Sequence, residues 1–163
     1  MSLRFFAQIT TIASLMLVSA CQTPQPHGGF NRTQTEMLRE QGFVETSEGW
    51  QLSLADRLLF DVDSSELRPE MQANIARVAR GLISVGISSA RVEGHTDATG
   101  ASEYNQNLSL ARAQVVASVA QGSGFAAARL VVRGWGETRP IADNGTDAGR
   151  AENRRVVIIV TAL

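Results

Sequence analysis

The chain has 163 residues and a formal net charge of −1, and 44% of its residues are hydrophobic while 19% are charged. These values are typical of one folded domain with accessory segments, and they argue against wholesale disorder. The near-zero net charge gives no electrostatic reason to expect a nucleic-acid partner, so we predict none.

The N-terminal stretch has the composition of an export signal. Arg4 precedes a largely apolar run from Phe5 to Val18, which is short for a membrane span. Small residues then precede Cys21, the only cysteine in the chain. Cleavage by ordinary signal peptidase would explain the small residues but would not need that cysteine. We predict a signal peptide over residues 1–20.

The run Val18-Ser19-Ala20-Cys21 resembles the lipobox of bacterial lipoproteins, in which the cysteine becomes the acylated N-terminus of the mature chain. The resemblance implies lipidation of Cys21, and two or more acyl chains give stable membrane attachment. Gln22 is similar to the residue found there in lipoproteins sorted to the outer membrane, facing the periplasm. Residues 21–32 combine the lipidated cysteine with a Pro-, Gly- and Gln-rich tether.

Residues 33–54 are predicted to form a helix and a hairpin that precede the main domain. Residues 33–41 suit a short helix, which Gly42 ends. Two runs containing Phe43 and Trp50 then flank a turn, as in a β-hairpin.

The main domain, residues 55–163, begins with Leu58-Leu59-Phe60, which we predict to be a buried strand. Pro69 is acceptable in the first turn of the helix that follows. Apolar residues then recur at helical spacing and predict one buried face of a helix ending near Ser84. They are Met71, Ile75, Val78, Ala79, Leu82 and Ile83.

A second strand around Arg91–Glu93 leads into the polar turn Gly94–Gly100 and a second long helix. The predicted core face of this helix consists of Tyr104, Leu108, Ala111, Val115 and Val119. Asn105, Ser109 and Arg112 form a polar stripe beside it. This arrangement would let Arg112 face the turn while Leu108 packs inward.

Leu130–Val132 is predicted to be a third strand, and residues 148–153 a helical turn. Val156–Thr161 is apolar on both faces, so we expect this last strand to be central in the sheet. The order strand, helix, strand, helix, strand, strand predicts an α+β fold. Its expected form is a two-layer sandwich with a mixed sheet and helices on one face.

Asp97 in the turn and Arg112 on the following helix are the chemically suggestive pair. A strand-to-helix turn is a common place to hold a ligand, and opposite charges on rigid neighbours suit a zwitterion. On spacing alone, the favoured alternative is that Asp97 caps the second helix and that Arg112 is a helix charge exposed to solvent. With two histidines, one cysteine and no evident nucleophilic serine, we predict no catalytic centre, metal or cofactor.

An ordered series of motifs resembles the OmpA-like peptidoglycan-binding domain, which also occurs in the peptidoglycan-associated lipoprotein and in flagellar stator proteins. The likeness runs from about residue 54 to residue 163. The motifs are Phe60-Asp61, Glu93-Gly94-His95-Thr96-Asp97, Tyr104-Asn105, Leu108-Ser109-x-x-Arg112-Ala113, Gly134-x-Gly136-Glu137, Pro140-Ile141-Ala142-Asp143-Asn144 and Gly149-Arg150-Ala151-Glu152-Asn153-Arg154-Arg155-Val156.

This resemblance implies recognition of the diaminopimelate side chain in the peptidoglycan stem peptide. Asp97 would accept hydrogen bonds from its ammonium group, and Arg112 would form a bidentate pair with its carboxylate. The further candidate binding residues are Gly94, Thr96, Asn105, Asp61, Arg150, Asn153 and Arg154. For three of these, Arg150, Asn153 and Arg154, a structural role is equally open. One arginine of the Arg154-Arg155 pair could instead hold loops together through Asp61 or Asp143.

The function implied is that of an outer-membrane lipoprotein that ties the membrane to the cell wall. Three runs are also similar to those of a regulatory lipoprotein of this family, which sequesters a periplasmic repressor of a diguanylate cyclase. They are Gln41-Gly42-Phe43, Glu48-Gly49-Trp50 and Leu54-Ala55-Asp56-Arg57-Leu58-Leu59-Phe60. Residues 33–54 would then capture the partner, and a homodimer is a further open possibility. Exposure of Phe43 and Trp50 would favour partner capture, whereas burial would make them structural. A wall hydrolase would need paired carboxylates in a cleft, which the sequence does not indicate.

Overall fold

The computed structural model describes residues 29–61 and 64–162. The predicted signal peptide, Cys21 and most of the predicted tether lie outside the described residues. The helices and strands are α1 (Arg32–Glu40), β1 (Val44–Thr46), β2 (Gly49–Ala55), α2 (Asp56–Leu59), α3 (Pro69–Ser84), β3 (Ala90–His95), α4 (Ser102–Gly122), the 3-10 helix η1 (Ala127–Arg129), β4 (Leu130–Gly134), α5 (Asp147–Asn153) and β5 (Arg155–Val160).

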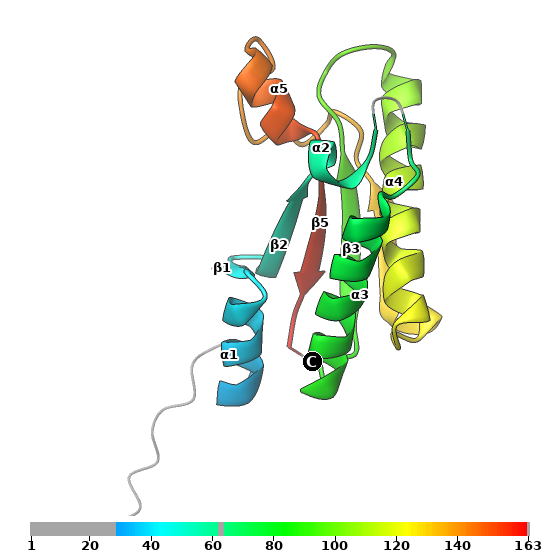
Figure 1. Ribbon diagram of the computed structural model, residues 1–163. Helices are drawn as coiled ribbons and strands as arrows, with labels where there is room; N and C mark the ends of the chain where they lie inside the picture. The colour runs from blue at the N-terminus through cyan, green and yellow to red at the C-terminus, as the bar shows by residue number, and fades with distance from the viewer. Residues whose placement is uncertain (1–28, 62–63, 163) are drawn as a thin grey trace, which may run out of the picture.

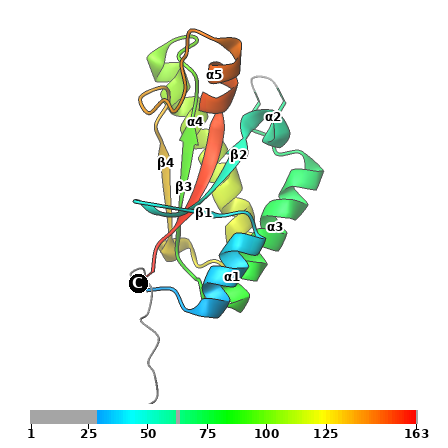
Figure 2. The same ribbon diagram turned by 90° about the vertical axis from the view of Figure 1, so that its left-hand side faces the viewer.

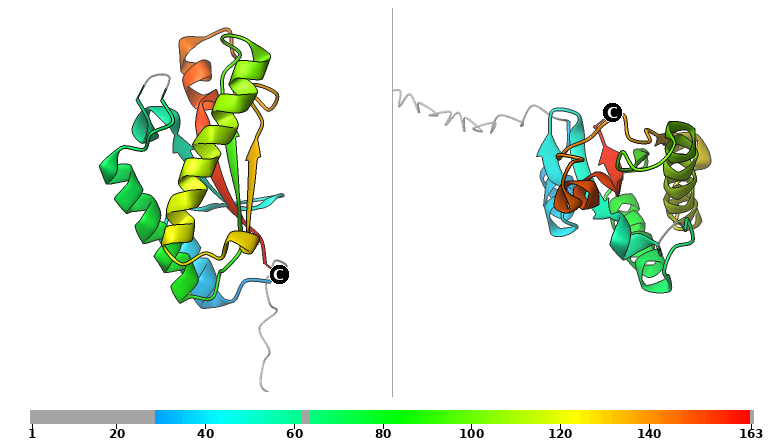
Figure 3. Two further views of the ribbon diagram at one scale, coloured as in Figure 1. Left: turned by 90° about the vertical axis from the view of Figure 1, so that its right-hand side faces the viewer. Right: turned by 90° about the horizontal axis from the view of Figure 1, so that it is seen from above.

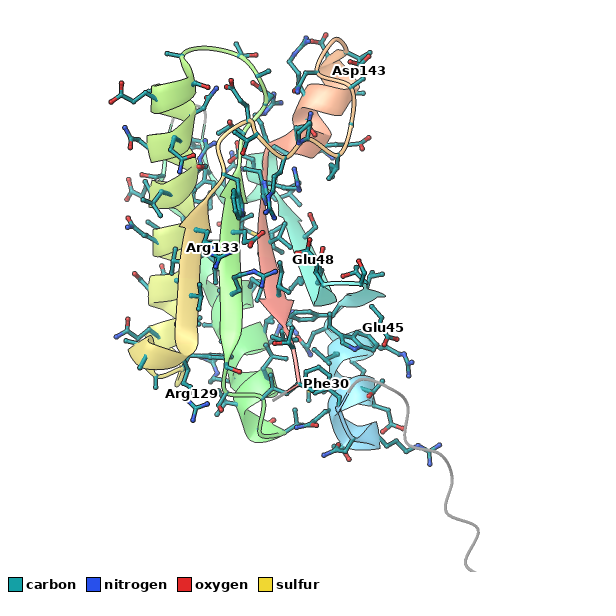
Figure 4. The ribbon with its side chains drawn as sticks, turned by 180° about the vertical axis from the view of Figure 1, so that it is seen from behind. Phe30, Glu45, Glu48, Arg129, Arg133 and Asp143 are labelled. Atoms are coloured by element: carbon teal, nitrogen blue, oxygen red, sulfur yellow. The ribbon has the colours of Figure 1, made fainter. Side chains whose placement is uncertain are left out.

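The fold is the predicted two-layer α/β sandwich. The strands form one mixed sheet in the order β1-β2-β5-β3-β4, in which β3 and β4 are parallel and the other neighbours are antiparallel. Helices α3 and α4 cover one face of this sheet, and α1 lies beside α3 (Figures 2 and 3). Figure 4 shows the opposite face, on the side of Arg133 and Glu48.

Strand β5 is central, as its apolar sequence predicts. All six of its residues are buried, and it pairs with β2 on one side and β3 on the other. An apolar strand is stable at this position because both of its faces and both of its edges are covered.

The first part of the domain differs from the prediction. Residues 56–59 form the short helix α2, not a strand, and Phe60 makes only an isolated bridge to Leu67. The predicted hairpin also does not stand apart from the domain. Strand β2 pairs with β5 along its length, from Trp50 opposite Val160 to Ala55 opposite Arg155. It therefore takes the place in the sheet that the prediction gave to Leu58–Phe60.

Helix α3 matches its prediction, and helix α4 does not. The buried side of α3 includes Ile75, Val78, Ala79 and Leu82. The buried side of α4 consists of Asn105, Ser109, Arg112, Ala113, Val116, Ala117 and Ala120. Tyr104 is exposed, and the other four predicted core residues are only partly buried. The polar stripe faces inward because it finds hydrogen-bond partners there, and the small alanines let the helix lie close to the sheet.

The folded body begins within the predicted tether. Phe30 is buried, and Asn31 caps α1 through a reciprocal capping box with Gln34. Phe43 and Trp50 are 3% and 6% exposed, so both belong to the hydrophobic core. Among the described residues, no helix is long and apolar enough to span a membrane.

Candidate functional site

Helices α2 and α5 and the beginning of α4 lie at the same end of the sheet (Figure 1). A pocket of about 360 Å³ is formed by residues from this end of the molecule. It is lined by Asp56, Thr96, Asp97, Thr99, Tyr104, Asn105, Leu108, Arg112, Arg150 and Arg154. Six of these, namely Thr96, Asp97, Asn105, Arg112, Arg150 and Arg154, are predicted binding residues. The tertiary structure therefore brings most of the predicted site together in one cavity.

Asp97 follows β3 and is fixed in the pocket wall. Its Oδ1 accepts a hydrogen bond of 2.8 Å from the backbone N–H of Thr99, and its Oδ2 is ion-paired with Arg154. Burial raises the pKa of this carboxyl, but the hydrogen bonds from Arg154 and Thr99 outweigh that effect and lower the pKa below its ordinary value. Asp97 is therefore a stable carboxylate at neutral pH, suited to hold a cation.

Arg112 reaches the same pocket from α4 and is 4% exposed. Its Nη1 lies 2.9 Å from Oδ1 of Asp56, and its Nε donates to the backbone oxygen of Ser64 at 3.0 Å. The guanidinium also lies over the ring of Phe60, 5.0 Å from the ring centroid. These contacts hold a buried positive charge in one orientation.

Asp56 is a site residue that the sequence prediction missed. Burial raises the pKa of its carboxyl, an effect that the nearby Arg112 opposes. The sequence analysis predicted a strand over residues 58–60, and that strand gave no reason to place Asp56 beside α4. An acidic residue in the first turn of a short helix is the signal that could have indicated α2.

Asn105 holds the turn that carries Asp97. Its side-chain amide donates to the backbone oxygens of Asp97 and Thr99, at 3.3 and 3.1 Å, and to the carboxylate of Glu137. The hydrogen bonds from Asn105 and Ser102 lower the pKa of Glu137. Thr96 is also buried, and its Oγ1 has no hydrogen-bond partner among the described residues. Asn105 therefore shapes the pocket, and Thr96 lines it while its hydroxyl oxygen is buried.

Three predicted binding residues lie outside the pocket lining. Gly94 is buried where β3 meets α4. Asn153 is fully buried, and its Oδ1 accepts the backbone N–H groups of Ile141 and Ala142. Asp61 is exposed and forms a 2.7 Å ion pair with Arg68. Structural contacts thus account for Gly94 and Asn153.

The arginines near the C-terminus have partners that differ from the loop-holding alternative. Arg154 pairs with Asp97, whereas the side chain of Arg155 donates to the backbone oxygens of Asn153 and Arg139. Among the described residues, neither guanidinium is paired with Asp61 or Asp143. Arg150 donates to the backbone oxygen of Asn144 and is ion-paired with Asp147. The described residues contain no group of three or more His, Cys, Asp or Glu that could hold a metal ion.

Comparison with known proteins decides the family. The sequence model of the OmpA family matches residues 59–154. The chain belongs to the OmpA family. Its OmpA domain includes the whole turn after β3 and helix α4, and therefore most of the pocket lining.

The likeness to individual OmpA-family proteins extends beyond the domain. The chain is 45% identical over 150 residues to the outer-membrane lipoprotein YfiB of Pseudomonas aeruginosa, covering 91% of this chain and 89% of that protein. It is 42% identical over 147 residues to lipoprotein YfiB of Escherichia coli, covering 90% and 91%. These relationships support an outer-membrane location facing the periplasm.

Solved structures of OmpA-like domains show the same fold. The cell wall anchor of the type VI secretion system from Pseudomonas aeruginosa matches with a TM-score of 0.67 and 31% identity, over 81% of this chain and 96% of that one. The peptidoglycan-associated lipoprotein from Burkholderia pseudomallei matches with a TM-score of 0.58 and 29% identity, over 67% and 89%. The names of these relatives describe lipoproteins and an anchor rather than enzymes, and peptidoglycan binding fits the family.

Proposed function

We propose that the pocket binds peptidoglycan through the free end of the diaminopimelate side chain in the stem peptide. That end carries an ammonium and a carboxylate on one carbon atom. The observation that carries the proposal is the presence of two buried, opposite charges, Asp97 and Arg112, in the lining of one cavity. The site would recognise the wall without any chemical step.

The geometry supports a recognition site more than a simple capping role. A capping aspartate and a solvated arginine would both be exposed, whereas Asp97 and Arg112 are 6% and 4% exposed. Each charge-assisted pair with the ligand should contribute about 1.5–3 kcal/mol, or roughly 10- to 100-fold in affinity.

The proposal includes an anchor on Cys21, which would tie the wall-binding domain to the outer membrane. Eight residues separate Cys21 from Phe30, which is the first buried residue in the part of the chain that the structure describes. A fully extended chain of that length spans at most roughly 3 nm. The domain would therefore bind peptidoglycan strands that lie close to the membrane.

The experiment is cosedimentation with purified peptidoglycan of the diaminopimelate type. The protein used begins at Gln22 and keeps every described helix and strand. Asp97→Asn and Arg112→Lys preserve size or charge, and each should lose at least tenfold in affinity. Glu103→Gln, an exposed acid in the first turn of α4, is the matched control and should bind normally.

Lysine-type peptidoglycan, which lacks the side-chain carboxylate, should bind much more weakly than the diaminopimelate type. If the unmodified protein binds neither type, or if the folded Asp97→Asn and Arg112→Lys variants bind as well as it does, the proposal is wrong. Circular dichroism of each variant separates lost binding from lost folding.

The regulatory alternative gains no support from the residues that were expected to decide it. Phe43 and Trp50 are core residues and form no exposed apolar patch. Capture of a periplasmic partner by residues 33–54, and homodimer formation, therefore stay predictions from sequence resemblance. The pocket favours wall binding.

A further inference from the structure

Four charged side chains of the pocket form two ion pairs, which we call the charge quartet: Asp56, Asp97, Arg112 and Arg154. Asp56 Oδ1 lies 2.9 Å from Arg112 Nη1, and Asp97 Oδ2 is paired with Arg154 Nη1. All four side chains line the same cavity. The two acids come from different elements, since Asp56 begins α2 whereas Asp97 follows β3.

Strand pairing places the quartet across the end of the sheet. Strand β5 lies between β2 and β3, so Arg154, just before β5, sits between Asp56, just after β2, and Asp97, just after β3. The backbone N–H of Asp56 donates to the backbone oxygen of Arg154 at 3.1 Å, which fixes these two neighbours. Arg112 approaches from the helix layer. Acidic and basic groups thus alternate around the cavity.

The electrostatics of Asp56 favour an additional cation. Burial raises the pKa of its carboxyl, the charges of Arg112 and Arg154 lower it, and the negative charge of Asp97 raises it further. The two carboxylates are therefore close enough to repel each other. A cation between them would relieve this repulsion and part of the unfavourable burial.

We propose that Asp56 is a second acid for the ligand's ammonium group, and that the quartet selects a zwitterionic end group. The ammonium would lie between Asp56 and Asp97, and the carboxylate between Arg112 and Arg154. This inference rests on the proposed function, because it assigns further residues to the same ligand. It differs from a purely structural role, in which Asp56 only orients Arg112.

The selection follows from the internal pairing. A ligand with only a carboxylate meets an Arg112 that Asp56 already neutralises, and it leaves the pocket with excess negative charge. A ligand with only an ammonium meets an Asp97 that Arg154 already neutralises. A zwitterion brings an ammonium for the two acids and a carboxylate for the two arginines. It can therefore separate both internal ion pairs without leaving a buried charge unpaired.

The test uses three synthetic stem tripeptides that contain diaminopimelate. One is unmodified, one is acetylated on the side-chain amine, and one carries an amide in place of the side-chain carboxylate. Affinities are measured by NMR titration into the millimolar range for the unmodified protein, Asp56→Asn and the control Glu103→Gln. A contact between Asp56 and the ammonium predicts that Asp56→Asn weakens the unmodified and the amidated peptides by about tenfold or more. The acetylated peptide, which lacks the cation, should not be weakened, and it should bind as well or better because Asp56 no longer neutralises Arg112.

A role through Arg112 alone would give the reverse pattern, and that result overturns the inference. Asp56→Asn would then weaken binding of the unmodified and acetylated peptides, which both keep the carboxylate, and would spare the amidated one. The inference is also overturned if each of the three peptides binds Asp56→Asn with the same affinity as the unmodified protein.

A second measurement needs no variant, in case Asp56→Asn does not fold. The side-chain carbon resonance of Asp56 reports its pKa during a pH titration. Binding of the unmodified peptide should lower that pKa, whereas the acetylated peptide should not, and equal effects of both peptides contradict the inference. If the unmodified protein binds neither the unmodified peptide nor peptidoglycan, the proposed function itself fails, which is a distinct result.

Discussion

Gly94 and Ser109 meet backbone to backbone at the crossing of β3 and α4. A Cβ atom built on Gly94 would lie 1.9 Å from the backbone oxygen of Ser109, so no other residue fits there without movement of the helix. The hydroxyl of Ser109 also accepts the backbone N–H of Gly136 at 2.9 Å. This contact fixes the distance between the turn that holds Asp97 and the helix that holds Arg112. The glycine of this motif is therefore a spacer for the site.

Gly94→Ala is expected to destabilise the fold by about 1–3 kcal/mol or more, because the extra methyl group would push α4 away from the sheet. Urea denaturation measures this change. Gly122→Ala is the matched control, since no atom lies within 4 Å of its added methyl group. That control should be neutral or stabilising by about 0.5–1 kcal/mol. Similar stability of both variants would contradict the close approach.

His95 is predicted to make stability depend on pH. Burial, with the nearby charges of Arg155 and Arg139, lowers its pKa from 6.5 to about 3. Below pH 6.5 the unfolded chain therefore takes up a proton that the folded chain does not, so stability falls as the pH falls toward 3. Below pH 6.5 each pH unit lowers the free energy of unfolding by about 1.4 kcal/mol. The total loss between about pH 7.5 and pH 5 is therefore about 2 kcal/mol.

The His95→Gln variant isolates this contribution. Its free energy of unfolding should be lower at neutral pH, because the buried ring is lost, but it should lack the additional fall on acidification. The difference between the two proteins cancels the titration of groups that they share, including Asp56 and Asp97. A difference that stays constant from about pH 7.5 to about pH 5 would show that His95 does not titrate in this way.

Asn153 is expected to act on stability rather than on ligand contact. Its Oδ1 accepts two backbone N–H groups of the loop before α5, and Asn153→Ala would leave both without that acceptor. A loss of about 1–3 kcal/mol should follow in urea denaturation. The neighbouring exposed residue provides the control, because Glu152→Ala should stay within about 0.5 kcal/mol. Folded Asn153→Ala protein should retain most of its peptidoglycan binding, and loss equal to that of Asp97→Asn would restore Asn153 to the binding site.

Cys21 is expected to carry the membrane anchor. Cys21→Ser removes the only thiol that could be acylated, so cells fed a labelled fatty acid should label the unmodified full-length chain but not the variant. Peptidoglycan binding of the extracted protein should be unchanged, because the pocket lies in the folded domain. Equal labelling of the two proteins, or labelling of neither, would exclude lipidation of Cys21 as the anchor.

Much of the fold follows from local sequence signals. Pro69 and the apolar spacing from Met71 to Ile83 predict α3 with its correct face, and the uniform apolarity of Val156–Val160 predicts a central strand. Both signals depend on which side chains leave water, and the dominant contribution of apolar burial makes them reliable. The motif around Asp97 and Arg112 also identifies the family correctly, and both residues line one pocket.

The face of α4 could not be predicted in this way. Apolar periodicity favours Leu108, Val115 and Val119, yet the helix buries Asn105, Ser109 and Arg112 instead. Those polar groups are stable inside only because Asp97, Gly136 and Asp56 offer partners there. Since these partners come from other elements, the helix sequence alone does not contain the information.

The sequence by itself determined the family, the sandwich and the two opposite charges of the site. Only the tertiary structure decided that β2 belongs to the main sheet, that Asp56 lines the pocket, and that Arg154 forms an ion pair with Asp97. The physical reason is one of range. Apolar burial and turn chemistry act on residues near one another in the chain, whereas ion pairs and strand register join residues that only folding brings together.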